Sequence, residues 1–231
     1  AFTDDDTIPD ARWLEEGERA LAGRVAICGR VVVPPVSEPP TDHELMTRGL
    51  ESAEFVTANA FVRRAALERV GGFDERFLRA WREDSDLQFR LQALGEVARA
   101  HSATVLHPVR PERWGVCLRQ QRNAFFDALL YKKHPRLYRE RIRAVPPWDY
   151  YAIVALALAT PVLLAAGARP AAATSFAAAL GLVGRLAVRR LRRTSREPGH
   201  VVEMIVTSAL IPFLSVYWRL RGAWTFRVLF L

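Results

Sequence analysis

The feature that most restricts the fold is a long apolar region in the last third of the chain. Residues 150–168 carry no charged side chain, and these 19 residues come close to the ~20 that an α-helix needs to cross a bilayer. Two further apolar stretches follow at about 170–188 and 201–218, and they contain only Arg185 and Glu203 as charged residues. The sequence therefore predicts an all-α transmembrane region over residues 146–231 rather than a buried hairpin of a soluble domain.

The positive charge is concentrated in the same region. Residues 1–145 contain 23 Lys and Arg against 22 Asp and Glu, whereas residues 146–231 contain 10 against 3. The excess lies in an apolar half, which favours membrane lipids over nucleic acid as its partner. No combination of basic and aromatic residues typical of base recognition is found. Cys28 and Cys117 are isolated, so neither a disulfide framework nor a zinc site is expected.

Basic clusters beside the apolar segments predict their orientation. One cluster lies over residues 132–143, and another lies between the second and third segments, at Arg189, Arg190, Arg192, Arg193 and Arg196. The positive-inside rule places both in the cytoplasm. A third full crossing would leave Arg219, Arg221 and Arg227 outside. We therefore expect the third segment to be short, tilted or re-entrant, or residues 222–231 to lie along the membrane.

The first 145 residues alternate between strand-like and helix-like patterns. Strands are expected over 24–33, 55–64 and 97–106, and helices over 11–22, 65–70 and 114–131. The four prolines of 34–40 predict a surface loop that continues to about residue 48. Gly71 and Gly72 are expected to end the helix over 65–70.

A further helix begins within the stretch 71–91. Leu87, Leu91 and Leu94 recur at i, i+4 and i+7, as on one buried helix face, and Gly95 is expected to end this helix in a left-handed conformation. Glu83 and Asp84 then lie in its first turn. Free backbone N–H groups and the helix dipole stabilise a carboxylate there, so Asp84 is expected to stay ionised and point outward. The alternative is simple helix capping.

Three consecutive aspartates follow the strand-like start of the chain. Adjacent carboxylates repel one another unless a positive group lies among them. A hard divalent cation, which prefers oxygen ligands, would offset this repulsion. Asp4 and Asp6 would lie on the same side of an extended chain, so both reach one ion. The alternative is a solvated acidic turn.

The two acidic motifs, with GGFDE between them, resemble the nucleotide-sugar-dependent glycosyltransferases of family 2. The likeness covers about residues 1–135. It implies an α/β fold, in which residues 1–145 form the C-terminal portion of a Rossmann-like GT-A catalytic domain and residues 146–231 form the transmembrane part. In this family a DxD motif holds a divalent metal at the donor diphosphate, and the Asp of a later Glu-Asp pair is the catalytic base.

The resemblance implies roles for individual residues. Asp4 and Asp6 would hold Mn²⁺ or Mg²⁺, Asp84 would be the general base, and Glu83 would orient the loop or the acceptor. A late histidine approaches the metal or the diphosphate in several GT-A enzymes, and His107 occupies that place. A purely structural role for His107 is the alternative.

Four further residues are expected to contact the donor or the acceptor. They are Asp5, Asn59, Trp81 and Arg82. Asn59 matches a position where family members often carry Asn near the substrate, and its alternative role is to bond the backbone of a turn. Trp81 can stack on a sugar ring and Arg82 can bind phosphate, although Trp81 can equally pack in the protein.

The resemblance implies an inverting, metal-dependent glycosyltransferase that uses a nucleotide-sugar donor. The membrane part suggests a lipid-linked or envelope-polysaccharide acceptor, and a multi-pass protein of the inner membrane with a cytoplasmic catalytic part. Residues 119–123, RQQRN, do not fit the QxxRW signature of processive synthases, which favours transfer of a single sugar.

Two other functional classes stay open from the sequence. One is a non-catalytic membrane anchor or docking module, and the other is a metal-dependent membrane phosphohydrolase built on the aspartate triplet. The chain begins without Met and opens directly on a strand-like segment, so we expect a fragment that lacks the donor-binding half before the DxD motif.

Overall fold

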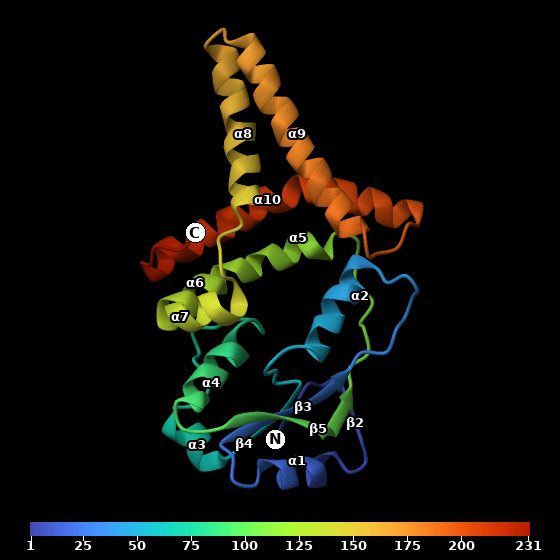
Figure 1. The fold of residues 1–231 in the computed structure, drawn as a ribbon, viewed down its shortest axis with the longest axis vertical. Coiled ribbons are helices and arrows are strands. Elements are labelled where there is room, and N and C mark those ends of the chain that lie inside the picture. The colour runs from blue at the N-terminus through green and yellow to red at the C-terminus, as the bar shows by residue number, and fades with distance from the viewer. The chain divides into compact units, whose positions relative to one another are not determined.

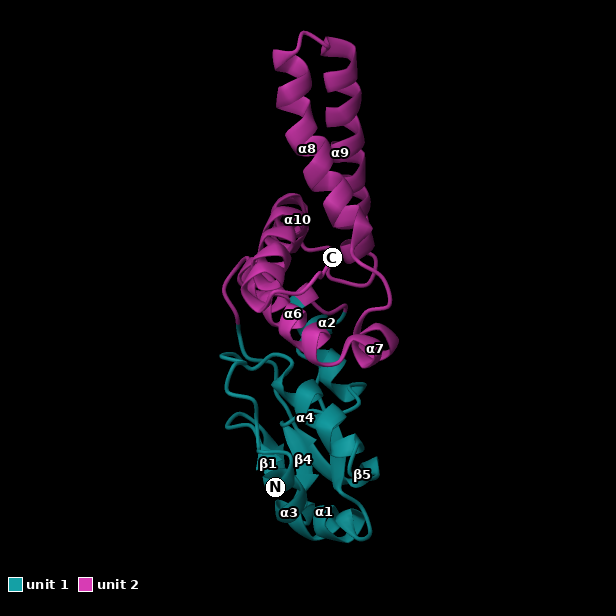
Figure 2. Cartoon of the chain, turned by 90° about the vertical axis from the view of Figure 1, so that its left-hand side faces the viewer, with its two compact units in different colours: residues 1–38, 43–111 teal, residues 39–42, 112–231 magenta.

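The computed structural model describes residues 1–231, which form two compact units. Unit 1 comprises residues 1–38 and 43–111, and unit 2 comprises residues 39–42 and 112–231 (Figure 2). The domain boundary expected near residue 145 lies inside unit 2, because residues 112–145 pack with the later apolar helices.

Unit 1 is built on a five-stranded mixed sheet in the order β1-β4-β3-β5-β2 (Figure 1). Its central strands β3 and β5 are parallel, and Ala26 pairs with Val97 at one end and Val32 with Leu106 at the other. The other three pairings are antiparallel: β4 pairs with β3, β1 with β4, and β2 with β5. The strand bounds are β1 Phe2–Thr3, β2 Ile8–Pro9, β3 Ala26–Val32, β4 Asn59–Val62 and β5 Val97–Leu106.

Helices cover both sides of this sheet. Figure 1 shows α1 on one side and α4 on the other. On α1 the buried Trp13 packs against Phe61 at a ring distance of 4.9 Å, and on α4 Leu87 and Leu91 are fully buried in the core. The helix bounds are α1 Trp13–Leu21, α2 Asp42–Thr47, η1 Arg48–Glu51, α3 Arg64–Arg69 and α4 Glu83–Gln92.

Most elements of unit 1 lie where the sequence patterns predicted them, with two corrections. The expected loop before residue 48 contains the short helix α2. Gly71 and Gly72 do end α3 with positive φ angles of 78° and 69°, but Gly95 has no positive φ. A Cβ on Gly95 would lie 2.6 Å from Val25 Cγ2, so this glycine permits close packing instead of a left-handed turn.

Unit 2 is entirely helical. Its first part contains α5, η2, α6, α7 and the π-helical turn η3, at Val116–Gln120, Gln121–Asn123, Ala124–Lys133, Pro135–Leu137 and Tyr138–Ile142. Its second part contains α8 Trp148–Ala165, α9 Arg169–Leu191 and α10 Pro198–Phe226. Helices α8 and α9 form a hairpin, and α10 runs across its foot next to α5 and α6 (Figures 1 and 2).

The helices α8, α9 and α10 are long and apolar enough to cross a membrane, judged by length and composition. Their mean hydropathies are 1.5, 1.6 and 1.7 in the most apolar windows. They differ in burial: the share of that window buried inside the protein is 6% for α8, 28% for α9 and 39% for α10. Three long apolar helices at the C-terminus therefore fit a membrane protein, as the sequence predicted.

Candidate active site

The aspartate triplet forms the loop between β1 and β2, which lie at opposite edges of the sheet. This loop therefore crosses the carboxyl ends of the central strands, where open α/β sheets bind their ligands. It is a turn rather than the extended chain expected, because Thr7 donates to the Asp4 carbonyl from both its backbone N and its Oγ1. The turn still brings Asp4 and Asp6 together.

A histidine completes this cluster from the end of β5. His107 Nε2 lies 3.7 Å from Asp4 Oδ2 and 3.7 Å from Asp6 Oδ1. One ligand atom from each of the three side chains lies within 4.8 Å of the others. The His107 backbone N donates to the Val32 carbonyl at 2.8 Å, which fixes the histidine to β3.

The chemistry of these three side chains suits a divalent cation. Two carboxylates and an imidazole supply the oxygen and nitrogen ligands that Mn²⁺ accepts, and the carboxylates suit Mg²⁺. The pKa of Asp4 is raised, first by burial and then by the charges of Asp6 and Asp5, while His107 opposes the rise. A cation would relieve that repulsion.

Arg110 also binds the acidic loop, and the sequence patterns did not single it out. Its Nε lies 2.6 Å from Asp6 Oδ2, and its Nη2 lies 2.8 Å from Asp5 Oδ1. Asp5 is otherwise exposed, with 91% of its side chain accessible. Arg110 follows His107 by three residues, but only the folded chain shows that both reach the triplet.

The acidic pair lies at the start of α4, as predicted. Arg82 takes a left-handed conformation with φ 76°, and the helix begins at the next residue. Asp84 Oδ1 accepts hydrogen bonds from the backbone N of Ser85 at 2.6 Å and from its Oγ at 3.3 Å. Asp84 does not point freely outward, because the side chain is largely covered and burial raises its pKa.

Among the carboxyl groups of the site, that of Glu83 has the largest shift in pKa. Its Oε2 is buried and makes no hydrogen bond. Burial, followed by the charge of Asp84, raises the pKa of Glu83 to about 7, and the charge of Asp4 adds to this rise. Glu83 is therefore a carboxyl group that changes charge near neutral pH.

The two acidic groups meet at one edge of the sheet. Helix α4 leads through a short turn into β5 and packs on it, so its first turn lies toward the carboxyl ends of β3 and β5. The aspartate loop crosses the same ends. Electrostatic effects agree with this placement, because Asp4 acts on Glu83, and Asp84 acts on Cys28 of β3.

Asn59 was expected near the substrate, and the structure corrects this. The side chain is fully buried on β4. Its Nδ2 donates to the carbonyls of Arg30 and Ala103, each at 2.9 Å, and its Oδ1 accepts from Trp13 Nε1 at 2.9 Å. All its hydrogen-bonding groups are engaged inside the core, so Asn59 joins β4, β3, β5 and α1.

Trp81 and Arg82 lie together just before α4. The Arg82 guanidinium lies 4.6 Å from the centre of the Trp81 ring, and both side chains are half-buried. This contact leaves their expected role in donor or acceptor binding as a prediction. Asp5, the remaining residue of that group, is exposed beside Arg110.

Fold and site together define an α/β enzyme with acidic side chains gathered at the carboxyl edge of its sheet, followed by apolar helices. The sequence model described as glycosyl transferase family group 2 matches residues 1–218. The chain belongs to this family and is a glycosyltransferase, rather than the docking module or phosphohydrolase that the sequence alone left open. No curated protein and no solved structure matches it.

Proposed function

We propose that this glycosyltransferase moves a sugar from a nucleotide-sugar donor to an acceptor hydroxyl with inversion at the anomeric carbon. The observation that carries the proposal is the placement of two acidic groups at one edge of the sheet. Asp4, Asp6 and His107 form the first group, and Glu83 and Asp84 form the second. One group suits the diphosphate end of a donor, and the other suits an acceptor.

The first group would bind Mn²⁺ or Mg²⁺ through Asp4, Asp6 and His107. The ion would supply positive charge that stabilises the departing nucleoside diphosphate. The exposed guanidinium of Arg110 beside the same loop can bind a phosphate oxygen as well. These groups together orient the donor.

The second group would handle the proton of the acceptor. Asp84 acts as general base and takes the proton of the attacking hydroxyl, while the acceptor oxygen bonds to the anomeric carbon and the bond to the diphosphate breaks. A raised pKa makes Asp84 a stronger base than an ordinary aspartate. Glu83, partly buried beside Asp84, orients the loop or the acceptor.

The acceptor is proposed to be lipid-linked or part of an envelope polysaccharide. Three apolar helices follow the catalytic residues in the same chain, so the reaction takes place at a membrane. The arginine-rich segment over 189–196, at the end of α9 and just after it, favours the cytoplasmic side of the inner membrane for this segment and for the catalytic part. Transfer of one sugar, rather than polymerisation, remains the expectation from RQQRN at 119–123.

Two isosteric variants of the full-length protein test the base. Asp84→Asn should lower the transfer rate by about 10²–10⁴-fold, the usual contribution of a general base, with donor binding unchanged. Glu83→Gln, which keeps a hydrogen-bonding group, should raise KM for the acceptor more than it lowers kcat. A parental transfer rate in Asp84→Asn would defeat the assignment, and sugar release to water without acceptor transfer would defeat the proposed reaction.

A further inference from the structure

Helix α10 has an exposed apolar face along its whole length. Six large side chains recur on it at helical spacing and fall within about 60° of its circumference, at 100° per residue. All are at least 39% exposed. They are Val202, Val206, Phe213, Tyr217, Leu220 and Trp224. We call this set the α10 stripe.

The opposite face of α10 is covered by the segment from α5 to α6. At one end Gly115 N donates to Glu203 Oε1 at 2.7 Å, and at the other Lys132 Nζ donates to the Phe226 carbonyl at 2.7 Å. Between them Gly222 lies so close to α6 that a Cβ would be 2.5 Å from the Phe125 carbonyl oxygen. The two segments are therefore packed along almost all of α10.

This packing is incompatible with a helix that crosses a membrane. If α10 crossed, the α5–α6 segment would enter the hydrocarbon with it. That segment carries Arg119, Arg122, Asp127, Lys132 and Lys133, and each charged side chain at hydrocarbon depth is strongly unfavourable. The hairpin of α8 and α9 has no such companion, and α10 runs across its foot instead of beside it (Figures 1 and 2).

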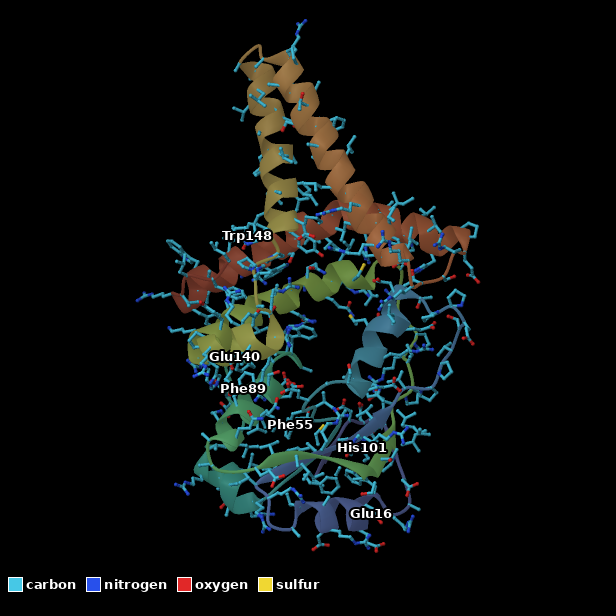
Figure 3. All side chains as sticks on the ribbon, viewed as in Figure 1. Glu16, Phe55, Phe89, His101, Glu140 and Trp148 are labelled. Atoms are coloured by element: carbon cyan, nitrogen blue, oxygen red, sulfur yellow. The ribbon has the colours of Figure 1, made fainter.

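Aromatic and basic residues mark the level of α10 as a membrane surface. Trp148, 58% exposed, lies at the foot of α8 (Figure 3), and Trp224 on α10 is 87% exposed. Tryptophan is enriched where hydrocarbon meets water. Exposed cations lie at both ends of α10, at Arg192, Arg193, Arg196, Arg221 and Arg227. Their charge complements anionic head groups.

We propose that α10 lies in the plane of an anionic membrane leaflet, with the α10 stripe in the acyl-chain boundary and α5–α6 on the water side. The chain then crosses the bilayer only twice, through α8 and α9. The segments before α8 and after α10 lie on the same side, which also places Arg219, Arg221 and Arg227 with the arginines of the segment over 189–196.

Depth measurements on the whole chain in vesicles of phosphatidylcholine and phosphatidylglycerol test the proposal. A background without native thiols, Cys28→Ala with Cys117→Ala, receives single cysteines at Val206, Phe213 or Leu220, each labelled with a polarity-sensitive fluorophore. Lipids spin-labelled near the head group should quench all three strongly and to the same extent, and lipids labelled deep in the chain should quench them weakly. Leu158→Cys on α8 is the control that deep quenchers should reach.

A second measurement locates the two ends of α10. Arg196→Cys and Leu229→Cys introduce thiols at exposed positions, so the packing of the helix is not disturbed. A membrane-impermeant maleimide should label both from the same side of sealed vesicles. Labelling from opposite sides, or deepest burial at Phe213, would overturn the proposal. Absence of lipid quenching over the stripe would overturn it too, since a protein partner would then cover this face.

A comparison of two lipid compositions tests whether α10 prefers anionic lipid. Replacing phosphatidylglycerol by phosphatidylcholine should weaken shallow quenching at Val206 and Leu220 and leave Leu158 unchanged, because the hairpin does not depend on head-group charge. Equal quenching of the α10 stripe in both lipids would overturn the anionic preference.

Discussion

Arg110 forms an ion pair with Asp6 of the acidic loop, and the arginine Nε lies 2.6 Å from Asp6 Oδ2. Asp6 is also one of the three side chains that suit a divalent cation. The guanidinium and a metal ion would therefore compete for one carboxylate. Arg110 is 59% exposed, so it has room to move toward a bound diphosphate when a metal ion takes its place.

Arg110→Ala should therefore bind Mn²⁺ more tightly than the parent protein. Exposed ion pairs are worth about 0.2–1 kcal/mol, so the gain should not exceed about fivefold in Kd. Counting free Mn²⁺ by electron paramagnetic resonance during a titration measures it without an activity assay. Arg113→Ala, which removes an exposed arginine without an ion pair, is the matched control and should leave the Kd unchanged. Weaker Mn²⁺ binding in Arg110→Ala would mean that the arginine supports the metal site.

Glu83→Gln should stabilise the protein at alkaline pH. The folded-state pKa of Glu83 is about 7, above its ordinary value of 4.5. A raised folded pKa contributes stability that is present below the unfolded pKa and is lost as pH rises through the folded pKa. Stability from this group therefore falls between about pH 4.5 and 7 in the parent protein, whereas the glutamine variant cannot ionise.

Thermal unfolding in detergent across this pH range measures the effect. The parent and Glu83→Gln should unfold at similar temperatures near pH 4, and the variant should have the higher Tm at pH 8. Glu75→Gln, at an exposed glutamate before the same helix, should leave the Tm unchanged at both pH values. A variant with a lower Tm than the parent at pH 8 would show that ionised Glu83 has a stabilising partner.

The sequence predicted those features of the fold that depend on neighbouring residues. Strand-favouring residues located β3 and β5, apolar spacing located the helix that begins at Glu83, and paired glycines located the left-handed end of α3. It also predicted the cluster of Asp4, Asp6 and His107, through the resemblance of motifs and their order. These signals are local or depend on motif identity, so no three-dimensional contact was needed to read them.

Contacts between distant residues could not be read in the same way. Arg110 meets Asp5 across 105 positions, and Asn59 bonds Trp13 across 46. Nothing local distinguishes such an arginine or asparagine from its neighbours. The prediction of a left-handed Gly95 was wrong for the same reason. Gly95 is needed for its contact with Val25, a residue that lies on the segment leading into β3.

Asn59→Ala should destabilise unit 1 strongly. It would leave the Trp13 indole N–H and the carbonyls of Arg30 and Ala103 without their present partner. Each buried group left unsatisfied costs about 1–3 kcal/mol, so a loss of about 3 kcal/mol or more is expected in denaturant unfolding. Trp13→Phe is the comparison, since it removes the indole donor and part of the buried ring but keeps the bonds of Asn59 to the Arg30 and Ala103 carbonyls. A loss below about 1 kcal/mol in Asn59→Ala would contradict the central role of the asparagine.

Gly222→Ala should loosen the packing of α10 on α6. The added Cβ would lie 2.5 Å from the Phe125 carbonyl oxygen and 3.0 Å from Ala128 Cβ, so the helices must separate. Overpacking of this kind costs about 1–3 kcal/mol, more than the roughly 0.5–1 kcal/mol that alanine gains over glycine inside a helix. Gly184→Ala on α9 meets nothing within 4 Å and should be neutral or mildly stabilising. Thermal unfolding of both variants in the same detergent compares them, and equal Tm values would mean that α10 does not rest on α6.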